Sequence, residues 1–151
     1  MKIEIRRARE TDCERMMQLV HELALYEKAP DEVTVTFDHF VESGFGEHPV
    51  WWAFVAEIDG KVEGFALYYI RYSTWKGKRL YLEDLLVTEK LRGQGAGRML
   101  FDALINECKQ NDYSGMAWQV LDWNEPAIHF YKKFDKVKIE GNWLNCTLNM
   151  G

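Results

Sequence analysis

The sequence has few of the residues that build metal sites or disulfide-stabilised folds. Its three cysteines, Cys13, Cys108 and Cys146, are far apart and odd in number, and no Cys-x-x-Cys pair is present. These features exclude a disulfide framework and a zinc site of the usual spacing. The four histidines do not form a spaced set of metal ligands either. We therefore expect reduced thiols and no bound metal.

Long apolar runs and a surplus of basic residues are also absent. Residues 1–7 lack the apolar run of a signal peptide, and no stretch approaches the length that spans a membrane. The formal net charge of -5 disfavours nucleic acid, whose binding normally needs a basic face, and favours cationic partners. These properties predict a cytoplasmic protein with neither a membrane nor a nucleic-acid partner.

The composition itself is typical of a globular enzyme or binding domain. The 151 residues are 47% hydrophobic and 14% aromatic, which is enough for a sizeable core and excludes a disordered or fibrous chain. No internal repeats, low-complexity tracts or linkers interrupt the sequence. We predict a single domain over residues 1–151.

Periodicity predicts alternating strands and helices. Apolar residues at helical spacing follow a capping pattern at Thr11 and Glu14, and an Asp59-Gly60 turn separates two halves of a hairpin. Asn124 and Pro126 begin a short helix, as N-cap and first-turn residues. The expected strands are residues 2–6, 51–57, 62–72, 79–87, 115–121, 137–140 and 143–149, and the expected helices are residues 11–26, 37–43, 97–111 and 124–134. This order predicts an α/β fold with a mixed, mostly antiparallel sheet and helices on both faces.

A glycine-rich stretch, Arg92-Gly93-Gln94-Gly95-Ala96-Gly97-Arg98, lies between an expected strand and an expected helix. Glycines at every second position let the backbone turn tightly and present N–H groups to an anion at the helix N-terminus. The spacing fits neither the dinucleotide fingerprint nor the phosphate-binding P-loop. It favours a pyrophosphate cradle, and a glycine-rich turn without a ligand is the alternative.

Two adjacent carboxylates, Glu83 and Asp84, end the strand that leads into this cradle. Successive side chains of a regular strand point to opposite faces of the sheet. We therefore expect at most one of the two to enter a given site directly. Asp84 is expected on the other face or at a bulge, where it would bind substrate or fix the loop.

Taken together, the motifs resemble those of the GNAT family of N-acetyltransferases. The cradle is similar to the pyrophosphate loop of that family, and the helix from Asn124 to Tyr131 is similar to its second cofactor-binding element. The resemblance extends to the subgroup of diamine acetyltransferases and thialysine N-epsilon-acetyltransferases through Tyr26-Glu27, residues 44–49, residues 81–84, residues 123–126 and residues 130–132. Residues 72–78 and 120–124 look more like the thialysine branch.

The resemblance implies acetyl-CoA as the acyl donor. It places the pyrophosphate on the cradle and the pantetheine arm along the strand that precedes the cradle. It also implies that residues of the short helix from Asn124 to Tyr131 contact the cofactor. The cofactor-binding residues implied in this way are Leu85, Leu86, Val87, Arg92, Gly93, Gln94, Gly95, Ala96, Gly97, Arg98, Asn124, Pro126, Ala127 and Tyr131.

The same resemblance implies roles in catalysis and substrate binding. Glu83 is the expected general base, acting through an ordered water, and Tyr131 is the expected general acid for the departing thiolate. Substrate contacts are expected from Tyr26, Glu27, Trp75, Glu83, Asp84 and Trp143. In the family the element around Trp143 reaches a partner subunit, so we expect a homodimer.

The leading hypothesis is therefore a cytoplasmic N-acetyltransferase that uses acetyl-CoA. Its substrate would be a primary amine of a small cationic molecule, such as a thialysine-like amino acid or a diamine or polyamine, which attacks directly in a ternary complex. The alternatives are a protein lysine acetyltransferase and a non-catalytic acyl-CoA sensor. The presence of both Glu83 and Tyr131 disfavours the sensor.

Overall fold

The chain forms two compact units in a computed structural model that describes residues 2–151. The first unit ends at Gln119, and the second runs from Val120 to Gly151. A single domain over residues 1–151 stays a prediction. No helix among residues 2–151 has the length and apolar character that crossing a membrane requires.

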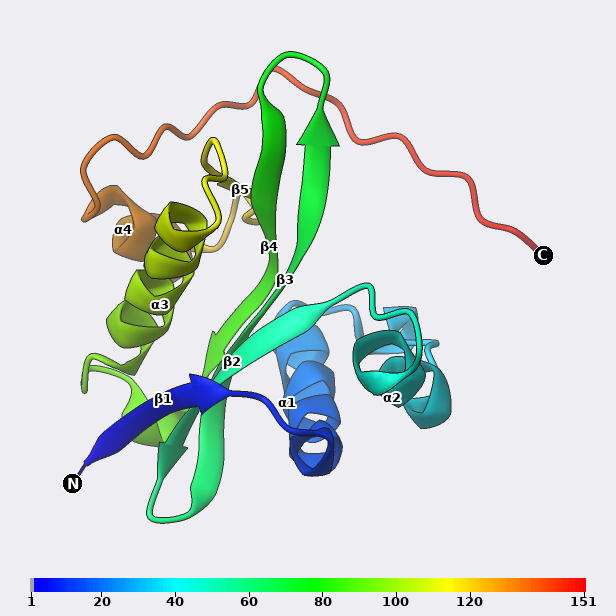
Figure 1. The fold of residues 1–151 in the computed structure, drawn as a ribbon, viewed down its shortest axis with the longest axis vertical. Helices are drawn as coiled ribbons and strands as arrows, with labels where there is room; N and C mark the ends of the chain where they lie inside the picture. Colours follow the sequence, from blue (N-terminus) through cyan, green and yellow to red (C-terminus); the bar gives the residue numbers. More distant parts are fainter. Residues whose placement is uncertain (1) are drawn as a thin grey trace. The chain divides into compact units, whose positions relative to one another are not determined.

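The first unit contains all five strands of the sheet and most of the helices (Figure 1). Its strands are β1 (Ile3–Arg7), β2 (Trp52–Ile58), β3 (Lys61–Ser73), β4 (Gly77–Val87) and β5 (Met116–Trp118). Its α-helices are α1 (Cys13–Tyr26), α2 (Phe37–Phe45) and α3 (Ala96–Gln110), and its short 3-10 helices are η1 (Glu10–Asp12), η2 (Pro30–Glu32) and η3 (Glu89–Leu91).

The strands follow one another across the sheet in the order β1-β2-β3-β4-β5. The first four are antiparallel neighbours, and β5 is parallel to β4 after the crossover through α3. Between β2 and β3 the chain reverses at Asp59 and Gly60, whose φ angles of 50° and 79° match the two-residue turn that the Asp-Gly pair predicts. The predicted mixed, mostly antiparallel sheet is confirmed.

Helices cover both faces of this sheet, as predicted. Figure 1 shows α1 and α2 on one side of the strands and α3 on the other. On the α1 side, Met16 and Leu19 pack with Val55 and Phe65 in a cluster of fully buried side chains. Helix α3 buries its own apolar side, including Leu100. Residues 62–68 of β3 are all buried, so side chains on both faces of this strand are covered.

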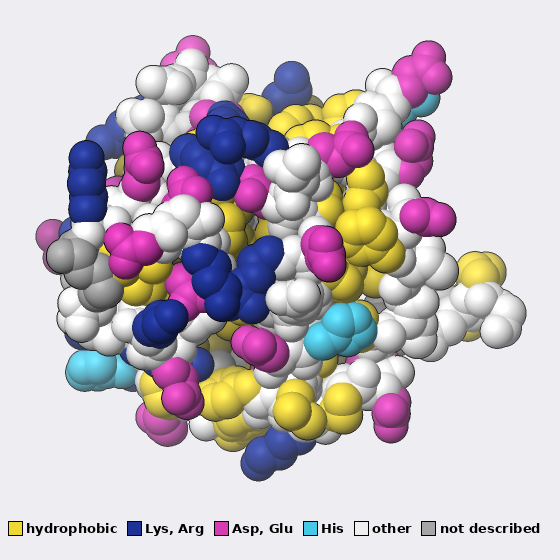
Figure 2. All heavy atoms as spheres, turned by 90° about the horizontal axis from the view of Figure 1, so that it is seen from below, with side chains coloured by type: hydrophobic (Ala, Val, Ile, Leu, Met, Phe, Trp, Pro, Cys, Tyr) yellow, Lys and Arg dark blue, Asp and Glu magenta, His cyan; other side chains and the backbone are white. Residues whose placement is uncertain are grey.

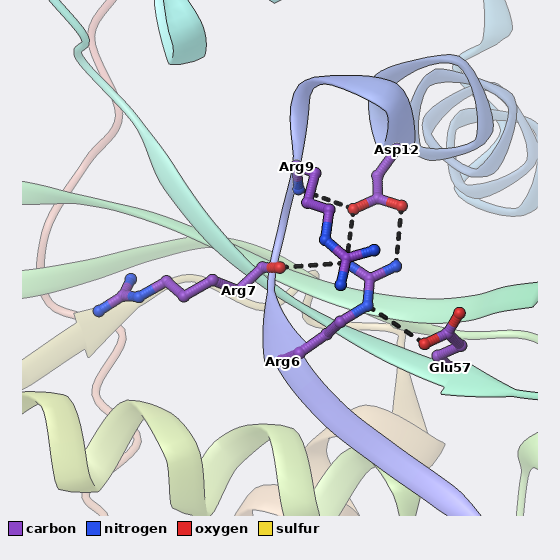
Figure 3. A network of polar contacts seen from close by, with 5 residues as sticks. All are labelled: Arg6, Arg7, Arg9, Asp12 and Glu57. Atoms are coloured by element: carbon purple, nitrogen blue, oxygen red, sulfur yellow. Dashed lines mark hydrogen bonds and ion pairs between the residues drawn. The ribbon is translucent and has the colours of Figure 1, made fainter. Parts of the chain in front are cut away.

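The junction between β1 and α1 differs from the expected capping box at Thr11. A 3-10 turn precedes the helix, and the Asp12 carboxylate accepts a hydrogen bond from the Arg9 backbone N–H at 2.7 Å. Arg6 donates to both oxygens of Asp12, at 2.8 and 3.0 Å, and reaches Glu57 on β2 at 3.2 Å (Figure 3). The capping prediction was wrong because Asp12, held by Arg6, is the side chain that bonds the backbone here.

The second unit contains one helix, α4 (Glu125–Lys132). Its predicted N-cap is confirmed, because the Asn124 side chain accepts from the Ala127 N–H at 3.3 Å. The predicted strands 137–140 and 143–149 are wrong, since the structure has no strand in either segment. Alternating apolar residues favour a strand, but a strand forms only beside a hydrogen-bonded neighbour. Similarly, the strand predicted over residues 115–121 is limited to β5.

Candidate active site

A β-bulge in β4 determines where the two adjacent carboxylates lie. Leu67 of β3 pairs with Asp84, and the next residue, Tyr68, pairs with Leu82, so Glu83 is an extra residue in β4. Leu67 and Tyr69 share a face of β3, and the Tyr69 hydroxyl lies 3.4 Å from Oε1 of Glu83. Glu83 and Asp84 are therefore on the same face. The expectation that they point to opposite faces was wrong, and the alternative of a bulge at this pair is what the structure contains.

Glu27, directly after α1, joins these two residues in a carboxylate cluster, which we define as Glu27, Glu83 and Asp84. Burial and the charges of Glu83 and Glu27 raise the pKa of Asp84 to about 7. Burial likewise raises the pKa of Glu27. Both shifts disfavour the ionised forms, as expected for carboxylates that are withdrawn from water near like charges.

No lysine or arginine among the described residues forms an ion pair with this carboxylate cluster. Arg71 instead lies over the ring of Tyr81, 5.2 Å from its centroid, and Tyr81 packs on Tyr69 at 5.2 Å. Burial, followed by the charge of Glu83, raises the pKa of Tyr69 to about 12, so this hydroxyl keeps its proton and can donate to Glu83. The cluster lacks a cationic partner from the part of the chain that the structure describes.

The glycine cradle lies between β4 and α3, as predicted, and the short helix η3, which was not predicted, precedes it. Gly93 and Gly95 have φ angles of 77° and 87°, in the left-handed region that favours glycine. The amides of Arg92 and Gln94 bond to carbonyls within the loop, at 3.2 and 3.1 Å. Because α3 begins at Ala96, the amides of its first turn have no carbonyl acceptor inside the helix. The cradle therefore offers backbone donors at a helix N-terminus, which suits an anion.

The edge of β4 beside the cradle is open over several residues. The parallel pairing with β5 involves Leu80 to Leu82, and no strand among the described residues pairs with this edge beyond Leu82. The open stretch includes Leu85, Leu86 and Val87, which the sequence assigns to the acyl donor. An extended molecule can add to such an edge as a further strand does.

The remaining predicted residues divide between the two units. Tyr26 lies at the cradle, with Arg92 6.0 Å from its ring centroid. Trp75 is 90% exposed in the turn between β3 and β4. The structure thus brings Tyr26 close to Arg92 and Glu27 close to Asp84. The other predicted residues, Asn124, Pro126, Ala127, Tyr131 and Trp143, lie in the second unit, and their place at the site stays a prediction.

Sequence reasoning offered a bulge only as an alternative for Asp84, and it missed the contact from Tyr69 to Glu83. A bulge depends on the pairing register of two strands, and neither Glu83 nor its neighbours carry a residue pattern that requires one. The aromatic pair Tyr69 and Tyr81 was a weak signal, since aromatic residues on paired strands are ordinary packing.

Among the described residues, no three His, Cys, Asp or Glu side chains are grouped as a metal site would need.

Comparisons with known proteins show the family of this chain. The model of the acetyltransferase (GNAT) family matches residues 13–135. The thialysine N-epsilon-acetyltransferase of Bos taurus is 40% identical over 136 residues, covering 85% of this chain and 80% of that protein. The Mus musculus protein of the same name is 38% identical over 152 residues, covering 93% and 89%.

Solved structures also share the fold. An aminoglycoside acetyltransferase from an uncultured soil metagenomic sample, in complex with trehalose, superimposes with a TM-score of 0.80. It is 19% identical, and the match covers 97% of each chain. The chain belongs to the acetyltransferase (GNAT) family and is an acyltransferase enzyme.

Proposed function

We propose that the protein transfers the acetyl group of acetyl-CoA to a primary amine of a small cationic substrate, by direct attack in a ternary complex. The observation that carries the proposal is the carboxylate cluster of Glu27, Glu83 and Asp84, which has no ion-pair partner among the described residues. Glu83 and Asp84 lie on the strand that leads to the cradle, and Glu27 follows α1. Glu27 and Asp84 are half-buried, and charges that are withdrawn from water in proteins are normally paired. A cationic substrate would supply the missing partner.

The residues around the cradle fit the acyl donor. The positive φ angles of Gly93 and Gly95 and the amide groups at the start of α3 suit a pyrophosphate. The open edge of β4 suits an extended arm with amide groups of its own, and a backbone N–H of Leu85 to Val87 can polarise a thioester carbonyl. When bound, acetyl-CoA supplies an acetyl group activated as a thioester.

Glu83 is the proposed general base. A lysine-like amine has a pKa near 10.4, so its neutral form costs roughly 4 to 5 kcal/mol at pH 7. Glu83 is exposed, which leaves room for an ordered water between its carboxylate and the ammonium. Asp84 and Glu27 would hold the cationic parts of the substrate that do not react, with Tyr26 and Trp75 as further contacts.

Tyr131 is the proposed general acid. It lies on α4 with 8% of its surface exposed, and its ring packs edge to face with Phe130 at 5.4 Å. A phenol can donate its proton to the thiolate that leaves when the amine attacks. Tyr131→Phe should lower turnover more than the affinity for CoA, and unchanged turnover would refute the role.

A thiol-release assay with acetyl-CoA tests the function. Thialysine, lysine, spermidine, spermine and putrescine are compared with a lysine-containing peptide at equal concentrations. Release with at least one small amine supports the proposal, and we expect thialysine to be used because the thialysine acetyltransferases match most of this chain. Release with the peptide alone would favour a protein lysine acetyltransferase. CoA binding without any release would favour the sensor.

We also propose a homodimer. The segment after α4 exposes four large apolar side chains, Trp143 (82%), Leu144 (89%), Leu148 (82%) and Met150 (84%). Apolar side chains gathered in one exposed segment are typical of an interaction site. Light scattering should give twice the chain mass, and deletion of residues 143–151 should reduce it to that of one chain.

A further inference from the structure

Glu63, at the start of β3, is a buried carboxylate for which the proposed chemistry has no role. It is 3% exposed, and it lies beside the Gly64 backbone, where β3 and β4 come close together. A Cβ on Gly64 would lie 2.8 Å from the Leu86 carbonyl oxygen, so the two strands leave no space for a side chain there. Glu63 therefore lies at the point where β4 leaves the sheet.

The Glu63 carboxylate joins three elements. Its Oε1 atom is 2.7 Å from Nη2 of Arg15 on α1, and its Oε2 atom is 3.4 Å from the Thr88 hydroxyl and 3.9 Å from Nζ of Lys90 on η3. The main chain adds a bond from the Thr88 N–H to the Glu63 carbonyl at 2.9 Å. Glu63 thus ties the chain between β4 and the cradle to both the sheet and α1.

Basic side chains surround this carboxylate. Besides Arg15 and Lys90, Lys61 places its Nζ 4.0 Å from Oε1. Figure 2 views the molecule from the end that carries the turn between β2 and β3, and Lys and Arg side chains gather there among Asp and Glu. Removal of the Glu63 charge would leave three cations facing one another without their shared partner.

Consecutive hydrogen bonds connect Thr88 to the cradle. Thr88 precedes η3, and its carbonyl accepts from the Leu91 N–H at 3.0 Å. Leu91 is 1% exposed, and its carbonyl accepts from the Gln94 N–H at 3.1 Å. Gln94 lies between Gly93 and Gly95. Thr88 is therefore linked to the glycines through two hydrogen bonds and one buried side chain.

We propose that Glu63 is a positioning residue for the acyl donor: its carboxylate, fixed by Arg15, holds Thr88 and Lys90 and thereby sets the conformation of the glycine cradle. The role rests on the proposed function, because it assumes that the cradle binds the pyrophosphate of CoA. Glu63 itself does not touch the reacting atoms and acts only through the loop.

Glu63→Gln tests the role, since it keeps the shape of the side chain and removes its charge. We expect the Kd for CoA, measured by calorimetry, and the KM for acetyl-CoA to rise about tenfold. The KM for the amine and kcat at saturating acetyl-CoA should stay within about twofold. A residue that only stabilises the fold would lower the melting temperature without separating the two KM values.

Glu57→Gln is the matched control. Like Glu63, Glu57 is a strand carboxylate paired to an arginine, with Arg6 at 3.2 Å, but it is only partly buried and its ion pair is with β1 rather than with the segment before the cradle. This variant should lose stability and keep its affinity for CoA. Thr88→Val serves as a second test variant if Glu63→Gln does not fold, because it removes the hydroxyl contact and retains every charge. It should weaken CoA binding in the same direction.

Hydrogen exchange of the ligand-free protein gives a readout that does not need the acyl donor. Amides of residues 88–98 should exchange faster in Glu63→Gln than in the wild type, and those of α2 should not change. If hydrogen exchange and CoA affinity are both unchanged in the folded Glu63→Gln variant, the positioning role of Glu63 is refuted and the proposed function is unaffected. Failure of the wild type to bind CoA would refute the proposed function, while the exchange measurement would still decide whether Glu63 orders the loop.

Discussion

Asp12 and Asp84 are both carboxylates withdrawn from solvent, and their surroundings are opposite. Burial opposes the charge of Asp12, but hydrogen bonds from Arg6 and from the Arg9 N–H outweigh it and lower the pKa of Asp12. Burial and two like charges raise the pKa of Asp84 to about 7. The fold itself supplies the partner of Asp12. The partner of Asp84 has to come from outside the described residues, which is how a binding site differs from a structural ion pair.

The two residues also give opposite dependences of stability on pH. The pKa of Asp12 is lower in the folded state than in the unfolded chain, where it is about 3.9. Asp12 therefore stabilises the folded protein at pH values above about 3.9, and this contribution is lost on acidification. A raised pKa acts the other way, so the contribution of Asp84 falls as pH rises from about 4 towards about 7. Ionisation of Asp84 thus costs stability that a bound cation would restore.

The largest effect is expected from Glu83→Gln, which removes the proposed base from the carboxylate cluster. Turnover at saturating substrates should fall by about 10²- to 10⁴-fold. The melting temperature should not change, because Glu83 is exposed. Glu4→Gln, at another exposed strand glutamate, should keep turnover within about twofold of the wild type. Full turnover in Glu83→Gln would remove Glu83 from the mechanism.

Asp12→Asn should lower stability and leave chemistry intact. The variant loses the charge that Arg6 contacts at 2.8 and 3.0 Å, and Glu57 is then the carboxylate that still pairs with Arg6. We expect the free energy of unfolding in urea to fall by about 2 to 3 kcal/mol. The kcat of the folded fraction should match the wild type. A stable variant would show that the Asp12 pair contributes no more than a surface ion pair.

Asp84→Asn should show the reverse pattern. Its free energy of unfolding should not fall, since the substitution removes a charge that lies near Glu83 and Glu27. The KM for the amine should rise about tenfold through loss of a charged partner. Equal destabilisation by Asp84→Asn and Asp12→Asn would break the comparison between the two carboxylates.

The pH dependence of the amine KM sharpens the same comparison. The amine stays cationic well above neutrality because its pKa is near 10.4. Asp84 becomes charged as pH rises through about 7, so the KM of the wild type should fall over this range. The KM of Asp84→Asn should be flatter between pH 6 and 8, a range of about one unit on either side of neutrality. If the KM for the amine depends on pH in the same way in the wild type and in Asp84→Asn, the pH dependence comes from a group other than Asp84.

Tyr69→Phe should have the smallest effect. The hydroxyl is 3.4 Å from Glu83, a long hydrogen bond whose loss should reduce kcat/KM about two- to fivefold. Tyr72→Phe, on the same strand and 70% exposed, is the control and should have no effect. A larger loss than that of Glu83→Gln would mean that Tyr69 acts on substrate directly.

Local residue patterns predicted the turn, the helix cap and the cradle. They did not predict the register in which β3 pairs with β4. The Asp59-Gly60 turn, the Asn124 cap and the cradle each depend on a residue type at a required conformation, and the structure contains all three. The bulge at Glu83 depends on how β3 and β4 pair over their whole length. A one-residue change of register transfers side chains between faces, so the composition of the carboxylate cluster was not predictable from neighbouring residues.

Residues 137–149 show a second limit of prediction from local sequence. Residues 137–149 carry the alternation of strands, which led us to predict two of them, yet whether they become strands is decided by the presence of a neighbouring edge. The N-cap at Thr11 failed for a related reason. Arg6, in another element, fixes Asp12 and so determines which side chain bonds the backbone. In each case the outcome depended on a partner outside the local residue pattern.

The open edge of β4 has a consequence for the behaviour of the protein in solution. An unpaired, flat strand edge is a template on which a second molecule can add, and it promotes aggregation. The bulge at Glu83 twists β4 where its pairing with β5 ends, so the regular stretch that remains is short. The irregularity that gathers the carboxylates thus also limits unwanted edge-to-edge association while the edge remains accessible to a ligand.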